Sequence, residues 1–184
     1  MRPVRKRYLI AVEGDGERSF AKFIDECGKS LGLPIHLDIC NVRGGGYQKM
    51  LSEAIKQRDQ KGSGKKNILV VDTDRFERRE DVWTIEKLKE QCKKENFELI
   101  VQNPNLEGVF ARMFVGNEGR NFISSQDAER ELKKKWPDYN KPQDAMKLRQ
   151  KFFLEDLLRM AKNDEHMKRM LEILGFKLVE SKSK

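Results

Sequence analysis

Apolar and polar positions follow two different spacings along the first hundred residues. Residues 7–12 and 67–71 are short, nearly continuous apolar runs. Such runs are typical of central strands in a parallel sheet, because helices cover both of its faces. In residues 35–40 apolar and polar side chains alternate, which predicts a strand nearer an edge of the sheet. A fourth strand is predicted over residues 97–101, FELIV.

Between these predicted strands, apolar residues recur at the spacing of an α-helix. One stripe runs from Phe20 to Leu31, a second from Met50 to Ile55, and a third from Val82 to Cys92. Strand and helix therefore alternate four times. This order predicts an α/β fold with a mostly parallel, four-stranded sheet flanked by helices and joined by right-handed crossovers.

After Val101 the pattern changes to helices alone. An apolar stripe from Leu106 to Phe114 predicts one helix, and a charged helix is expected near 125–136. The segment WPDYNKP interrupts the pattern, and longer helical stretches are predicted over 142–162 and 164–174.

A length of 184 residues fits one domain, which we divide into an α/β core over 1–115 and a helical extension over 116–184. No apolar stretch reaches the roughly 20 residues needed to span a bilayer. Glu13 ends the first apolar run too early for a signal peptide. The three widely spaced cysteines, without a CxxC pair, favour buried free thiols in a reducing cytoplasm.

The formal net charge is +8, with basic residues spread along the chain. Clusters include Arg75, Arg78 and Arg79, and the run Lys133 to Lys135. This excess favours a polyanionic partner, DNA or RNA, because neutralised phosphates release counterions. A basic, solvated surface accounts for the charge equally well. The basic residues are too scattered to predict an amphipathic membrane helix.

Acidic residues follow the predicted strands at the edge where parallel sheets bind ligands. The first strand ends at Glu13, and VVDTDRF ends the third with Asp72 and Asp74. We expect these side chains to lie together, with Glu17 and Glu107 a helical turn away. Close carboxylates repel one another unless cations neutralise them or their pKa values rise. Carboxylates in this arrangement suit Mg²⁺ or Mn²⁺, and a divalent ion beside a basic surface suggests phosphodiester chemistry.

Simpler roles are open for single acidic residues, since Asp15 is placed to cap the helix beginning near Gly16, and Asp74 to cap a turn.

Other chemistries fit less well. Arg75 and Phe76 occupy the positions where aspartate-nucleophile phosphatases carry other residues. GSGKK and RGGGYQK do not complete a phosphate-binding loop, and no serine or cysteine nucleophile with a base is evident.

Glutamate after the first strand and DxD after a later one resemble the Toprim fold, the metal-binding domain of topoisomerases, primases and several nucleases. The segments VEGDGERSFAKFI, VVDTDRF, QNPNLEGVF and YNKP are similar, in order and spacing, to the RloB-like family of prokaryotic Toprim proteins. The similarity covers most of residues 8–142. Gly16, Leu106 and Gly108 depart from the family pattern, which tends to have threonine, an aromatic and a bulky residue there.

The resemblance implies a metal-dependent nuclease associated with defence against phage or with restriction loci, and an ATPase as partner protein. Asp72 and Asp74 would be metal ligands, and Glu13 a metal ligand or general base. Glu17 and Glu107 would complete a second metal position.

Lys141, in the YNKP segment, would reach a phosphate or the transition-state charge, or is a solvated loop lysine. Tyr139 would serve packing.

Two alternatives to a nuclease are a catalytically silent nucleic-acid or partner-binding Toprim scaffold, and a phosphoryl-transfer enzyme acting on a small phosphate ester.

Overall fold

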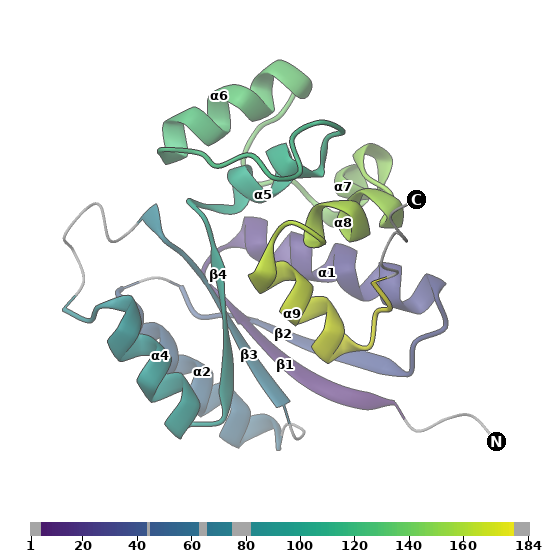
Figure 1. The fold of residues 1–184 in the computed structure, drawn as a ribbon. Coiled ribbons are helices and arrows are strands. Elements are labelled where there is room, and N and C mark those ends of the chain that lie inside the picture. Colours follow the sequence, from purple (N-terminus) through teal and green to yellow (C-terminus); the bar gives the residue numbers. More distant parts are fainter. Residues whose placement is uncertain (1–4, 44, 63–65, 75–81, 179–184) are drawn as a thin grey trace.

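The structure, a computed structural model, describes residues 5–43, 45–62, 66–74 and 82–178. Its centre is a four-stranded, all-parallel sheet in the order β2-β1-β3-β4 (Figure 1). The strands are β1 (Lys6–Val12), β2 (Ile35–Asn41), β3 (Lys66–Asp72) and β4 (Phe97–Gln102). The predicted α/β class is confirmed. The two continuous apolar runs occupy the centre of the sheet, and the alternating run forms an edge, as their patterns predict.

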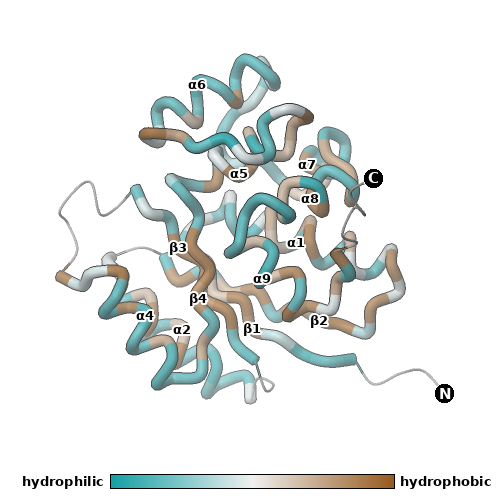
Figure 2. Tube along the Cα trace, viewed as in Figure 1, coloured by the Kyte–Doolittle hydropathy of each residue, from teal (hydrophilic) through white to brown (hydrophobic). Residues whose placement is uncertain are grey.

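Helices cover both faces of the sheet and give three layers (Figure 1). Side chains of β1 alternate between the layers, so Leu9 and Ala11 pack with α2 and α4, whereas Tyr8 and Ile10 pack with α1, α5 and α9. Figure 2 shows apolar residues gathered along the strands. The helices are α1 (Asp15–Ser30), α2 (Tyr47–Lys61), α4 (Ile85–Lys94), α5 (Leu106–Met113), α6 (Ser125–Lys135), α7 (Ala145–Lys151), α8 (Leu154–Ala161) and α9 (Glu165–Leu174).

The C-terminal extension shares the hydrophobic core of the α/β part. Trp136, Leu148, Leu157 and Leu171 belong to the same buried cluster as α1 and one face of the sheet. Since the buried residues of the extension that the structure describes belong to this shared cluster, its helices depend on the sheet for their packing. None of the helices in the described ranges has the length and apolar character required to cross a membrane.

The predicted helix over 142–162 is instead two helices, α7 and α8. The chain is extended at Phe152 and Phe153 between them. Phe152 is buried and packs against three aromatic rings, those of Phe110, Phe114 and Trp136. The Phe153 backbone N–H donates to Asp156 Oδ2 at 2.8 Å, which starts the next helix. Burial of one ring therefore overrides the local helical pattern at this point.

The third helical stripe also begins later than the pattern predicts. Thr84 caps α4, its Oγ1 accepting a hydrogen bond from the Lys87 N–H at 3.3 Å. Val82 lies before this cap and its side chain is exposed. The helix therefore contributes Leu88 and Cys92 to the core, without Val82.

Candidate active site

The segments that follow β3 and β4 are joined into one unit by backbone hydrogen bonds. Asp72 is the last residue of β3 and pairs with Gln102 of β4. The Thr73 N–H donates to the carbonyl oxygens of Gln102 at 3.0 Å and Pro104 at 2.9 Å. The Asp74 N–H donates to the Pro104 carbonyl at 3.0 Å. These bonds hold the DxD segment and the NPNLEG segment in one arrangement.

Asn105 and Gly108 determine where Glu107 lies. The Asn105 side chain caps α5 by accepting a hydrogen bond from the Gly108 N–H at 3.1 Å, so Glu107 falls in the first turn, and it is buried. A Cβ on Gly108 would lie 2.9 Å from Pro104 Cδ and 3.0 Å from the Asn103 carbonyl oxygen. The departure from the RloB-like pattern at Gly108 therefore has a steric reason, since this packing admits no side chain.

The start of α1 folds tightly against the same region. Gly14 is the N-cap residue and provides no side-chain cap, so the capping role predicted for Asp15 is wrong. Asp15 instead accepts a hydrogen bond from Asn41 Nδ2 at 3.1 Å. A Cβ on Gly14 would lie 2.6 Å from Glu17 Oε2, and one on Gly16 would approach Leu106 of α5 to 3.1 Å. The glycines therefore let the Glu17 carboxylate fold back over the turn and let α1 approach α5 closely.

A cavity of about 210 Å³ opens where these segments meet. Its lining includes four of the five predicted metal-binding residues and the predicted lysine: Glu17, Asp72, Asp74, Glu107 and Lys141. Glu13 directly follows β1 and is partly buried, but it is not among the residues that line the cavity. The sequence therefore predicted most of the acidic residues that line this cavity, and it also included Glu13, which is not among the lining residues.

Both carboxylate oxygens of Glu107 have partners from the segment after α6. The hydroxyl of Tyr139 donates to Glu107 Oε1 at 2.6 Å, and Lys141 Nζ lies 2.8 Å from Glu107 Oε2. Burial, followed by the neighbouring charge of Glu107, raises the pKa of Tyr139, so its hydroxyl keeps the proton that it donates. Tyr139 therefore does more than pack, and the side chain of Lys141, which is 53% exposed, is tied at its end to the cavity.

Asp72 lies in an unfavourable electrostatic environment. Its Oδ1 is buried and has no hydrogen-bond partner. Burial raises the pKa of Asp72 well above its usual value, and the charges of Glu17, Asp74 and Glu107 raise it further. Burial also raises the pKa of Glu17. The cavity therefore has an excess of negative charge, which a bound cation would relieve.

Two further residues support the DxD segment and were not predicted. The Tyr47 hydroxyl donates to the Asp72 carbonyl oxygen at 2.7 Å, and Ser125 Oγ donates to Asp74 Oδ2 at 2.9 Å. These contacts join residues 25 and 51 positions apart in the chain. Neither residue stands in a local pattern that points to the site, so sequence reasoning had no signal for them.

The donor chemistry of the cavity fits a hard divalent cation, and the unpartnered Asp72 Oδ1 is a suitable ligand atom. Within residues 5–43, 45–62, 66–74 and 82–178, no three histidine, cysteine or acidic side chains are grouped so that they could together hold a metal ion. Mg²⁺ does not require such a group, since it commonly binds through one or two carboxylates and keeps several waters.

Of the predicted basic clusters, the run on α6 is partly neutralised by neighbouring glutamates. On α6, Lys133 pairs with Glu129 at 2.8 Å and Lys134 with Glu131 at 3.4 Å. The cluster of Arg75, Arg78 and Arg79 lies outside the described residues. The run on α6 is therefore, in large part, a charge-compensated helix surface.

Comparison of the chain with protein-family models, with curated proteins and with solved structures found no match. The resemblance to RloB-like proteins thus depends on the four sequence segments themselves. All four contribute residues to the cavity, represented by Glu17, Asp72, Glu107 and Lys141. Residues as far apart in the chain as Glu17 and Lys141, which are 124 positions apart, thus meet at one place.

Proposed function

We propose that the protein is a metal-dependent nuclease of Toprim type that uses Mg²⁺ or Mn²⁺ to cleave phosphodiester bonds in DNA or RNA. The observation that carries the proposal is the convergence of the four segments on one cavity with a buried, unpartnered Asp72 oxygen beside the cation Lys141. Buried carboxylates with raised pKa values, grouped in a cavity, are typical of functional sites.

Asp72, Asp74 and Glu17 are the candidate metal ligands, because their carboxylates line the cavity, and one or two of them would hold the ion together with bound water. Glu13 directly precedes a lining residue, Gly14, and stays in the proposed ligand set, with the general-base role as its alternative. When bound, the divalent ion stabilises negative charge on the attacking and leaving oxygens of a phosphodiester.

Lys141 would contact a phosphate oxygen, and Glu107 would hold it in place. Both oxygens of Glu107 are engaged, one by Tyr139 and the other by Lys141. A metal bound by Glu107 would have to displace one of these partners. We therefore assign Glu107 to positioning Lys141, in preference to a second metal position.

The net charge of +8 supports a polyanionic substrate, because basic residues elsewhere on the chain can contact phosphates while a metal neutralises the cavity. The role in phage defence and the ATPase partner are implied by the resemblance to the RloB-like family and remain part of the proposal.

The test is incubation of the purified protein with single-stranded DNA, double-stranded DNA and total RNA, in Mg²⁺, Mn²⁺ or EDTA. We expect cleavage that EDTA abolishes. In Asp72→Ala and in Glu13→Ala, the cleavage rate should fall by roughly 10³-fold or more. Asp138→Ala, which changes an exposed carboxylate, should cut like the wild type. An Asp72→Ala protein with wild-type activity would disprove the proposed site.

A catalytically silent nucleic-acid or partner-binding scaffold is the second candidate. The lack of a three-residue metal-binding group among the described residues favours it. It predicts salt-sensitive binding of nucleic acid without cleavage in any of these metal conditions.

A further inference from the structure

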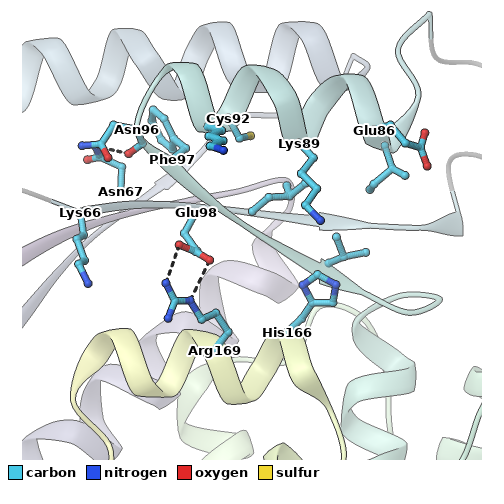
Figure 3. A pocket seen from close by; sticks show the side chains of 14 residues that line it. Lys66, Asn67, Glu86, Lys89, Cys92, Asn96, Phe97, Glu98, His166 and Arg169 are labelled. Atoms are coloured by element: carbon cyan, nitrogen blue, oxygen red, sulfur yellow. Dashed lines mark hydrogen bonds and ion pairs between the residues drawn. The ribbon is translucent and has the colours of Figure 1, made fainter.

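The outer edge of β4 forms one side of a groove that is separate from the carboxylate cavity. In the described residues β3 is the only strand paired with β4, so the opposite edge of β4 has no strand partner there. A groove of about 550 Å³ runs along this edge, between α4 and α9 (Figure 3). An unpaired strand edge presents backbone N–H and C=O groups that can pair with another chain.

The groove combines an apolar wall with the polar strand edge. Ile85, Leu99 and Val101 line it and are only partly buried against the core. When a strand is added to a sheet edge, its alternate side chains point toward the same face. Side chains that line a groove beside the edge can therefore contact every second residue of the added strand. The six residues of β4 give an edge of about 20 Å, enough for a peptide of similar length.

Charge gives the groove a preference among peptides. Lys66, Lys89 and Lys93 line it, and none of them forms an ion pair within the described ranges. Two acidic residues also line the groove: Glu98 is already paired with Arg169 at 3.0 Å, as the dashed lines in Figure 3 show, and Glu86 leaves the three lysines in excess. An occupant with negative side chains would therefore gain contacts that the groove does not satisfy itself.

The lysines on the other side of α4 show that the surplus of positive charge lies on the groove side of this helix. Lys87 and Lys94 do not line it, and both pair with Glu90, at 3.2 and 2.7 Å. The same helix thus carries a neutralised pair of lysines on one side and an uncompensated pair, Lys89 and Lys93, on the other.

We propose that this groove binds an extended, acidic peptide segment of a partner protein, which adds to the sheet as a strand beside β4. The strand edge supplies main-chain hydrogen bonds, the apolar wall accepts alternate side chains, and the three lysines select acidic residues. A nucleic acid would use the lysines but has no backbone that matches a strand edge. This binding site is independent of the proposed nuclease activity.

The test uses the full chain and a fluorescent octapeptide of alternating valine and glutamate, with binding followed by polarisation. We expect saturable binding and slower amide hydrogen exchange across Phe97–Gln102. Lys89→Gln with Lys93→Gln should weaken binding roughly 2- to 30-fold, the sum of two exposed ion pairs. The matched double variant Lys87→Gln with Lys94→Gln should bind like the wild type.

Two further probes test the mode of binding. The same peptide with alternate backbone nitrogens methylated should not bind, because it cannot pair with a strand edge. A thymidine oligonucleotide of equal charge should not compete. The proposal is overturned by absence of saturable binding, by equal losses in the two lysine pairs, by binding of the methylated peptide, or by competition from the oligonucleotide, which would make the groove a nucleic-acid surface.

Discussion

Replacement of Asp72 by asparagine should make the metal-free protein more stable. The wild-type carboxylate places a buried Oδ1 without a partner among the charges of Glu17, Asp74 and Glu107. The pKa of Asp72 is raised in the folded state. The stability that this residue contributes to the folded protein is therefore fully present below its ordinary pKa of 3.8, and it is lost as the pH rises through the folded-state pKa. At neutral pH the wild type carries this penalty and Asp72→Asn does not.

The expected magnitude follows from the burial of one unsatisfied polar atom, which costs about 1–3 kcal/mol. Asparagine retains a carbonyl oxygen at the same place, so only the lower part of this range should be recovered. A gain of about 1 kcal/mol in the free energy of unfolding corresponds to a rise in Tm of roughly 2–4 °C for a protein of this size.

Thermal unfolding at pH 7, at matched ionic strength, measures this effect and separates it from metal binding. With about 10 mM Mg²⁺ and an assumed Kd near 1 mM, the wild type should gain about 1.4 kcal/mol, roughly 3–6 °C in Tm. Asp72→Asn should show little of this gain, whereas Asp138→Asn, at an exposed position, should keep it.

Two results would refute the reasoning. The first is a lower metal-free Tm in Asp72→Asn, since the carboxylate would then be stabilising. The second is an equal Mg²⁺ response in wild type and variant, which would mean that Asp72 holds no metal. The difference in stability between the two proteins should also shrink as the pH falls toward about 3.8.

Three further outcomes concern buried residues of the fold. Arg112→Met should lower the free energy of unfolding by about 2–4 kcal/mol in a denaturant titration, because it removes the buried cation that pairs with the partly buried Asp164, 3.1 Å away; a loss below about 1 kcal/mol would contradict this. Gly108→Ala should cost about 1–3 kcal/mol in the same assay, and Gly119→Ala, where a Cβ would lie 4.0 Å from Asn163 Oδ1, should be neutral. Burial raises the pKa of Cys92 to about 12, so iodoacetamide at about pH 8 should label it only after unfolding, and rapid labelling of the native protein would contradict its burial.

The fold could be predicted from the sequence because its signals are local. Strand type and strand position depend on which faces are covered, and the continuous or alternating apolar runs report this directly. The same runs show where each strand ends, which is why Asp72 and Asp74 could be placed together before the structure was known. Glu13 also follows its strand directly, yet it is not among the residues that line the cavity, since strand ends specify only the edge of the sheet.

The remaining parts of the site depend on contacts that no local pattern encodes. The bond from Tyr139 to Glu107 joins positions 32 residues apart, and that from Ser125 to Asp74 joins positions 51 apart. The division of the helix at Phe152 has a similar origin, because the position of one ring among aromatic neighbours outweighs helix propensity.

The order of the cavity residues along the chain has a consequence for protein synthesis. Glu17, Asp72 and Glu107 all leave the ribosome before Lys141, which the cavity receives from the segment after α6. A nascent chain that stops short of Tyr139 has the carboxylates but neither partner of Glu107, and a buried charge without partners opposes closure of the site. For a protein proposed to cut nucleic acid, the site would then be completed only after most of the chain has been translated.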